Sequence, residues 1–350
     1  MGKREGTRPV YVGGVQVGGQ SKVVIQTMAN VKTEKTDDVA AQIKRCASSG
    51  AELMRLSVLD FHDAEAIAEL KRLSPIPLIA DIHFDYRLAL ACLDNGIDAI
   101  RINPGNIGDR ERIKEVVDSC RERKVPIRIG VNSGSMDSSV YDYSGKLEAA
   151  KLVESAEKHV KILESLGFFD IVVSLKGSSA LTSIEAYRLG SSRFPYPLHL
   201  GVTEAGPKDT GLLRSAACLS PLLLEGIGDT IRISLSDDPE EECLAARRLL
   251  HDLGLYPSLG TFISCPTCGR TQVDLIPAAK KIQRYLEKSG KKATVAIMGC
   301  VVNGPGEAKQ ADLGAAGGKG VWAIFKKGKV IRQVKDEDLI AEMEREIDLL

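Results

Sequence analysis

The chain has 350 residues, of which 43% are hydrophobic and 27% are charged. This composition is typical of a globular protein and excludes a disordered or fibrous chain, while the length favours one large and one small domain. Lysine plus arginine (47) equals aspartate plus glutamate (47), so no net charge attracts nucleic acid or an anionic membrane. Any anion must therefore be bound by a local arrangement of side chains.

The start of the chain, MGKREGTRPVYVGG, lacks the apolar core of a signal peptide, and no apolar run approaches the roughly 20 residues of a membrane span. We therefore expect a cytoplasmic protein with no membrane or nucleic-acid partner. Eight cysteines are too few for a disulfide scaffold here, so any that cluster are expected to be metal ligands or catalytic. Five lie in predicted helices and are expected to be buried: Cys46, Cys92, Cys120, Cys218 and Cys243.

Eight short β-branched runs alternate with segments whose apolar residues have helical spacing. Eight βα units predict a (β/α)8 barrel of the TIM type. The rival, a doubly wound open sheet, would normally show a G-x-G-x-x-G turn after the first strand, and QTMANVKT has none. The expected strands are VVIQTM, LMRLSV, PLIADI, AIRINP, PIRIGVN, DIVVSLKG, PLHLGVTEAG and TIRISLS.

A second, smaller α/β domain is expected after the barrel. The helical pattern ends near Leu253, and YPSLGTFISCPTCGR is interpreted as a linker. The predicted domains are residues 1–256 and 257–350. The second should contain, in order, a helix at 272–288, a strand at 293–298, a glycine-rich loop, a hairpin over VWAIFKKGKVIRQV and a helix at 336–349.

Polar side chains stand at the ends of the predicted strands, where a barrel's βα loops meet at one mouth. Burying arginine or lysine within an apolar strand costs free energy unless an anion pairs with the positive charge. Arginine is suited to bidentate contact with phosphate. We therefore predict a diphosphate site, with Asp81 and Glu204 as counter-charges; internal salt bridges are the alternative. The strand-end residues are Arg55, Ser57, Asp81, His83, Arg101, Asn103, Arg128, Asn132, Lys176, Glu204, Arg232 and Ser234.

The second domain contains the pattern C-x2-C-x31-C-x6-E, formed by Cys265, Cys268, Cys300 and Glu307. Neighbouring glycines leave room for the backbone to approach an inorganic cluster. A structural zinc site would normally show four Cys or His ligands, and no histidine or fourth cysteine follows Leu255. The spacing favours a [4Fe-4S] cluster over zinc, with Glu307 either a weak oxygen ligand or an ordinary first-turn helix residue.

Eight runs, in order along the chain, carry a family resemblance: ADIHFDYRLAL, RINPGNIG, IRIGVNSGS, VSLKGS, GVTEAG, IRISLS, SCPTCGR and MGCVVNGPGEA. They are similar to the 4-hydroxy-3-methylbut-2-enyl diphosphate synthase family. The resemblance spans roughly Val10 to Val334, and NGPGEA after a single cysteine is highly specific. Because the large insertion of the plant-type form is absent, the chain resembles the two-domain bacterial form.

The resemblance implies an iron-sulfur oxidoreductase acting on CH or CH2 groups. Its reaction would be the two-electron ring opening and dehydroxylation of 2-C-methyl-D-erythritol 2,4-cyclodiphosphate to (E)-4-hydroxy-3-methylbut-2-enyl diphosphate, in the non-mevalonate isoprenoid pathway. The barrel would bind the diphosphate and the small domain the [4Fe-4S] cluster. The implied partners are reduced flavodoxin or ferredoxin as donor, and a second copy in a head-to-tail homodimer whose cluster domains close the partner barrels.

By match of motif, the resemblance also implies roles for individual residues. Glu204 would be the essential barrel carboxylate and first candidate for proton donor, and Asn303 would lie near the substrate on the cluster side. The catalytic residues would be Glu204, Glu307, Asp81 and His83. The cluster ligands would be Cys265, Cys268, Cys300 and Glu307. The substrate would be bound by Arg55, Arg101, Asn103, Arg128, Asn132, Lys176, Arg232, Ser234 and Asn303.

A second hypothesis comes from another functional class: a non-redox, phosphate-binding barrel of the pterin or aldolase type with a zinc-bearing interaction module. Metal content separates the two hypotheses, because the reductase would contain iron and acid-labile sulfide and the module a single zinc.

Overall fold

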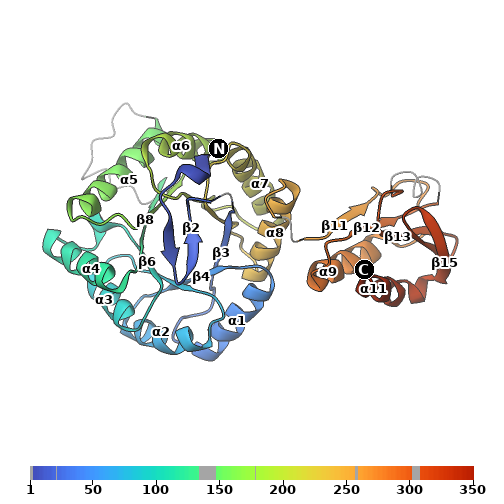
Figure 1. Cartoon of the computed structure of the whole chain (residues 1–350), viewed down its shortest axis with the longest axis horizontal. Helices are drawn as coiled ribbons and strands as arrows, with labels where there is room; N and C mark the ends of the chain where they lie inside the picture. Colours follow the sequence, from blue (N-terminus) through green and yellow to red (C-terminus); the bar gives the residue numbers. More distant parts are fainter. Residues whose placement is uncertain (1–2, 21, 134–146, 178, 257–258, 302–307) are drawn as a thin grey trace. The chain divides into compact units, whose positions relative to one another are not determined.

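The computed structural model describes residues 3–20, 22–133, 147–177, 179–256, 259–301 and 308–350. The chain divides into two compact units, Met1–Leu255 and Tyr256–Leu350 (Figure 1). The boundary predicted from the sequence lies one residue later, between residues 256 and 257.

Eight parallel strands form a closed sheet at the centre of the first unit (Figure 1). Their order is β8-β7-β6-β5-β4-β3-β10-β9, and a parallel bridge between Val173 and Leu198 joins the two ends. Each strand falls within one of the β-branched runs, so the predicted (β/α)8 barrel is confirmed. The strands are β3 (Val24–Met28), β4 (Leu53–Ser57), β5 (Leu78–Asp81), β6 (Ala99–Ile102), β7 (Ile127–Asn132), β8 (Ile171–Lys176), β9 (His199–Gly201) and β10 (Thr230–Arg232).

A helix follows each barrel strand and packs outside the sheet (Figure 1). Aspartates fix where some of them begin: Asp60 accepts a hydrogen bond from the Asp63 N–H at 3.1 Å, and Asp109 accepts one from the Arg112 N–H at 3.0 Å. The five cysteines expected in helices are all buried there, as predicted. The helices are α1 (Thr36–Ser48), α2 (Phe61–Leu73), α3 (Tyr86–Asp94), α4 (Arg110–Arg123), α5 (Glu148–Ser165), α6 (Ala180–Arg193), α7 (Lys208–Leu224) and α8 (Pro239–Asp252).

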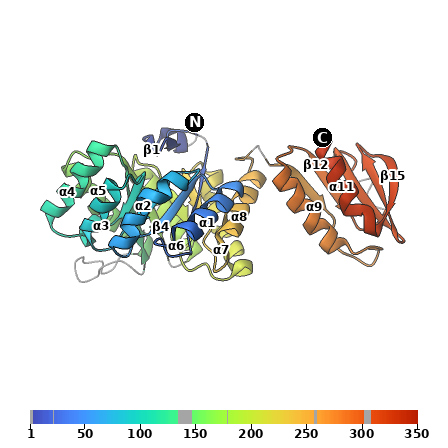
Figure 2. The same ribbon diagram turned by 90° about the horizontal axis from the view of Figure 1, so that it is seen from below.

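A short hairpin, β1 (Val10–Val12) and β2 (Val15–Val17), covers the end of the barrel where the strands begin (Figure 2). The sequence analysis did not predict it, although two glycines between alternating valines favour a tight hairpin. Its valines join an apolar cluster with residues at or near the starts of four barrel strands, which leaves the opposite end as the mouth. The cluster contains Val12, Val17, Val24, Leu53, Ile79 and Ala99.

The second unit contains a mixed sheet of order β11-β12-β13-β14-β15 with two helices packed on it. The linker interpretation was wrong for Thr261–Ser264, which form the edge strand β11. This strand is half-exposed and pairs only with β12, so it lacks the apolar run of a central strand. A second strand, β13, was also missed because LGAAGG has low strand propensity. The elements are β11 (Thr261–Ser264), α9 (Leu275–Ser289), β12 (Thr294–Met298), β13 (Leu313–Gly318), β14 (Val321–Lys326), β15 (Lys329–Lys335) and α11 (Leu339–Asp348).

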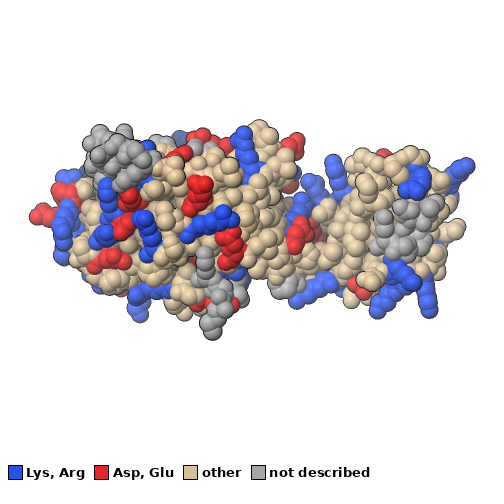
Figure 3. Space-filling model, turned by 90° about the horizontal axis from the view of Figure 1, so that it is seen from above, with Lys and Arg blue, Asp and Glu red and all other residues tan. Residues whose placement is uncertain are grey.

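The surface of the barrel unit carries both signs of charge interspersed over the face seen in Figure 3. That distribution agrees with the balanced composition of the whole chain. Among the described residues, no helix combines the length and apolar character needed to cross a bilayer.

We expect a fragment of residues 1–255 to fold on its own, because its closed sheet and surrounding helices lie within one compact unit. It should show a cooperative thermal transition and bind pyrophosphate with the affinity of the full chain, as measured by calorimetry. An aggregated fragment, or one without a cooperative transition, would show that the barrel needs the second unit.

Candidate active site

A cavity of about 270 Å³ opens where the barrel strands end. Every predicted barrel residue except Ser57 and Asn103 lines it. Four lining residues were not predicted; Ser174 could have been, because it lies two residues before Lys176 on β8 and so faces the same side. The lining consists of Arg55, Asp81, His83, Arg101, Arg128, Gly130, Asn132, Ser174, Lys176, Val202, Thr203, Glu204, Arg232 and Ser234.

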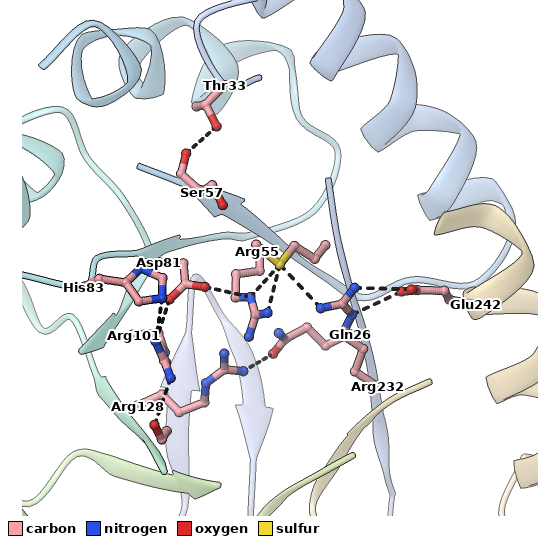
Figure 4. Close-up of polar contacts among 12 residues, drawn as sticks. Gln26, Thr33, Arg55, Ser57, Asp81, His83, Arg101, Arg128, Arg232 and Glu242 are labelled. Carbon is pink, nitrogen blue, oxygen red and sulfur yellow. Dashed lines mark hydrogen bonds and ion pairs between the residues drawn. The ribbon is translucent and has the colours of Figure 1, made fainter. Parts of the chain in front are cut away.

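Some predicted residues lie elsewhere. Asn103 is buried behind the wall, where its Oδ1 accepts a hydrogen bond from the Gly130 N–H at 3.1 Å. Ser57 lines a neighbouring cavity, and its carbonyl accepts a hydrogen bond from Thr33 (Figure 4). Asn303 and Glu307 lie outside the described residues.

Asp81 stands between two arginines of the cavity (Figure 4). Its carboxylate is 3.4 Å from Arg55 Nε and 3.2 Å from Arg101 Nη1, and Arg101 Nη1 is also 3.3 Å from His83 Nε2. Burial alone would raise the pKa of Asp81, but Arg55 and Arg101 more than offset this, and the pKa lies below its ordinary value. The carboxylate therefore stays ionised and orients both guanidiniums.

Arg232 has a partner that the sequence analysis missed. Glu242, a buried residue in the first turn of α8, accepts hydrogen bonds from Arg232 Nε at 3.1 Å and Nη2 at 3.2 Å (Figure 4). It also accepts from Thr27 Oγ1 at 2.8 Å and from the Leu235 N–H at 2.9 Å. Because Glu242 lies on a helix and ten residues after Arg232, strand alternation gives no sign of this pair.

Arg128 and Lys176 have no carboxylate within 4 Å among the described residues. Arg128 Nη1 donates to Gln26 Oε1 at 3.0 Å, while its buried Nε has no hydrogen-bond partner in the described structure. Burial lowers the pKa of Lys176 well below its ordinary value, and the positive charges of Arg55 and Arg232 lower it further. Burial likewise lowers the pKa of Arg55 to about 10. Positive charge is thus concentrated where solvent cannot screen it.

Two glycines make room for these cations. A side chain at Gly130 would begin 2.5 Å from Arg101 Nε, and one at Gly201 would begin 2.9 Å from Lys176 Nζ. A larger residue at either position would therefore push the cation out of its present place beside the strand.

Glu204 lies at the rim of the cavity, with its side chain exposed. Its φ of +54° is left-handed, which costs a residue with a side chain about 1–3 kcal/mol and is concentrated at functional positions. The sequence did not indicate this backbone geometry. An exposed carboxylate held in this way faces the cavity without neutralising the buried cations.

The described thiols of the second unit are distributed along one edge of its sheet. Ser264 on β11 pairs with Ile297 on β12, so Cys265 and Cys300 follow parallel strands at the same edge, and the Gly299 N–H donates to Cys265 Sγ at 3.2 Å. Cys268 is exposed, and hydrogen bonds from Arg270 lower the pKa of its thiol.

Among the described residues, no three His, Cys, Asp or Glu side chains converge on one metal position. The thiols nevertheless suit an iron-sulfur cluster: they are soft donors, a backbone N–H already points at one sulfur, and Gly269 has open space beside its α-carbon. The ligand set Cys265, Cys268, Cys300 and Glu307 remains a prediction.

Two family models match this chain: the GcpE TIM-barrel domain over residues 7–247 and the GcpE protein C-terminal domain over residues 261–349. The chain belongs to the GcpE family. Among its relatives, the 4-hydroxy-3-methylbut-2-en-1-yl diphosphate synthase (flavodoxin) of Clostridium perfringens is 51% identical over 99% of each chain. The enzyme of the same name from Anoxybacillus flavithermus is 50% identical, over 99% of this chain and 95% of its own.

Solved structures similar to this GcpE-family chain include two dihydropteroate synthases. The enzyme of Yersinia pestis has a TM-score of 0.53 and 12% identity, over 70% of this chain and 97% of its own. The enzyme of Coxiella burnetii has a TM-score of 0.51 and 12% identity, over 71% of this chain and 98% of its own. At this identity the likeness shows the barrel fold alone. It does not favour the non-redox barrel hypothesis over the function of the GcpE relatives.

We expect pyrophosphate binding to be accompanied by proton uptake. The pKa of Lys176 is lowered in the free cavity, and a bound anion raises it, so a proton is taken up at any pH between the two values. Affinity should then fall as pH rises through this window. Calorimetry in buffers of different ionisation enthalpy measures the uptake, which Lys176→Met should reduce; equal uptake in both proteins would contradict the assignment to Lys176.

Replacing Lys176 by methionine should also stabilise the ligand-free protein by about 1–3 kcal/mol, because it removes a buried amine whose charged form has no carboxylate partner among the described residues. The same variant should lose pyrophosphate binding. Chemical denaturation and calorimetry measure the two effects, and Lys44→Met, the same change at an exposed site on α1, is the control. Destabilisation by Lys176→Met alone would show that the ammonium is satisfied in the free protein.

Proposed function

We propose that the cation-lined cavity of this GcpE-family protein binds 2-C-methyl-D-erythritol 2,4-cyclodiphosphate. The protein is an iron-sulfur oxidoreductase that converts this cyclic diphosphate to (E)-4-hydroxy-3-methylbut-2-enyl diphosphate in the non-mevalonate isoprenoid pathway. The observation that supports the site is the excess of buried positive charge: five cations line the cavity, while Asp81 and Glu242 are the carboxylates paired with them among the described residues.

The diphosphate would supply the missing negative charge. Lys176 and Arg128 would contact it most directly, because no carboxylate competes for them, whereas Arg55, Arg101 and Arg232 would each turn unused N–H groups toward it. Asn132 and Ser234 would add neutral hydrogen bonds from the lining. Asn103 would act through Gly130 rather than by touching the substrate.

Glu204 would hold the proton that leaves with the substrate hydroxyl as water. Its exposed position at the rim keeps it apart from the buried arginines, so it is available to a bound substrate. Asp81 would remain ionised and keep Arg55 and Arg101 in place, and His83 would orient Arg101 from the solvent side.

The [4Fe-4S] cluster of this family would pass two electrons, one at a time, from the donor to the substrate and would provide a Lewis-acidic iron. Cys265, Cys268 and Cys300 would hold it, with Glu307 as a weaker oxygen ligand and Asn303 near the substrate. Reduced flavodoxin, which the names of the relatives include, is the proposed electron donor. A reducing cytoplasm is the compartment in which these free thiols and the cluster would persist.

We propose that the active unit is a head-to-tail homodimer. Barrel helices run antiparallel to the strands, so α8 ends at Asp252 on the side opposite the mouth, and the chain leaves the barrel there. If the second unit of each chain closed the barrel of its partner, the cysteine thiols would lie near the partner's cavity cations. No long linker between the two units of one chain would then be needed.

Metal analysis tests the assigned function. Protein purified without oxygen should contain about four irons and four acid-labile sulfides per chain. Cys300→Ala should lose most of both while keeping pyrophosphate binding, whereas Cys120→Ala on α4 should keep the iron. One zinc per chain, retained in air, would instead support the interaction-module hypothesis.

Mixing two inactive variants tests the homodimer. Cys300→Ala removes a proposed cluster ligand and Glu204→Gln a proposed barrel acid, so each alone should have little turnover. Co-expressed, they can form one dimer interface with an intact cluster and an intact barrel, and random pairing should restore about a quarter of the activity. Co-expressed chains that stay as inactive as either variant would argue for a site completed within one chain.

A further inference from the structure

Five side chains at the cavity wall form a continuous row of polar contacts, and four of the five are charged. The row runs from Asp81 to Arg55, then to the thioether of Met28, then to Arg232 and Glu242 (Figure 4). Carboxylates lie at both ends of the row, and a sulfur atom lies in the middle. In Figure 4 this sulfur is the yellow atom from which dashed lines run to both arginines.

Met28, the last residue of β3, contacts both guanidiniums through the same atom. Its Sδ accepts hydrogen bonds from Arg55 Nε at 3.1 Å and Nη2 at 2.8 Å, and from Arg232 Nη1 at 3.4 Å. The side chain is half-buried, and register places Met28 beside Arg55 on the neighbouring strand. Its position between the arginines therefore follows from strand pairing.

A thioether suits this position for two physical reasons. It is a weak, neutral acceptor, so it orients the N–H groups without cancelling either charge. A phosphate oxygen is a much stronger partner for the same N–H groups, so exchanging sulfur for phosphate gains charge-assisted hydrogen bonds. A carboxylate in the same place would orient the arginines equally well but would neutralise them.

We propose that Met28 is a positioning residue for diphosphate binding: its sulfur fixes the spacing of Arg55 and Arg232 and releases their N–H groups to the ligand. This inference rests on the proposed diphosphate site and adds a residue to it. A bridging diphosphate needs both guanidiniums at a fixed separation, whereas a single phosphate needs only one of them.

Met28→Leu in the full-length protein tests the role of the sulfur, since leucine keeps the volume and removes the acceptor. Calorimetric affinity for pyrophosphate should fall about three- to tenfold, the loss expected when the two arginines are no longer held in place before the ligand binds. Affinity for inorganic phosphate should change less than about twofold. Met54→Leu is the matched control, because Met54 precedes Arg55 on β4 but is fully buried in the core.

Met28→Gln tests the need for a weak acceptor. Glutamine has a similar length, but its amide oxygen holds guanidinium N–H groups more strongly, so the ligand-free Tm should not fall while pyrophosphate affinity does. A merely structural methionine would lower both together. In turnover assays Met28→Leu should raise KM and leave kcat unchanged.

Three outcomes would overturn the inference. If wild-type protein binds pyrophosphate and Met28→Leu binds it equally well, the sulfur does not position the arginines, and the proposed function stands. If Met28→Gln binds pyrophosphate as tightly as the wild type, the weakness of the thioether has no role. Wild-type protein that fails to bind pyrophosphate at all would overturn the diphosphate site together with this role for Met28.

Discussion

The structure of the barrel depends on an electrostatic constraint: five positive side chains share a cavity with too few negative ones. Arg55, Arg101, Arg128, Lys176 and Arg232 repel one another in a region that water screens poorly, and burial lowers the pKa of Lys176 and Arg128. This repulsion destabilises the ligand-free protein. The barrel still folds because its other interactions outweigh the repulsion. A ligand with two adjacent phosphates relieves the repulsion, which converts stored unfavourable energy into affinity.

Other features of the barrel keep these cations separated and directed into the cavity. Asp81 and Glu242 fix three of the arginines from behind, Gly130 and Gly201 leave space for the side chains that cross them, and the β1–β2 hairpin closes the opposite end with apolar contacts. Asp81 and Glu242 offset part of the positive charge and the glycines and hairpin add none, so the cavity keeps an excess of positive charge for the ligand. Among the lining residues that the structure describes, Glu204 is the exposed carboxylate, and it lies at the rim on a strained backbone.

The likeness to dihydropteroate synthases illustrates how little of this chemistry the fold itself carries. The barrel is shared at 12% identity, whereas the GcpE relatives match this chain at about 50% identity over nearly its whole length, the thiol-bearing unit included. What distinguishes the chain chemically is therefore the set of side chains that the barrel presents, together with a second unit whose cysteines follow adjacent parallel strands.

The sequence by itself determined the eight-stranded barrel, because each strand is a short β-branched run and helical spacing fills the intervals. It also indicated all five cations that line the cavity, because side chains alternate along a strand and the strand ends meet at one mouth. Only the tertiary structure decided the partnerships. Glu242 reaches Arg232 from a helix, Met28 lies between two arginines through strand pairing, and Asn103 turns to Gly130 instead of the cavity. These contacts depend on distances between elements remote in sequence, which no local pattern encodes.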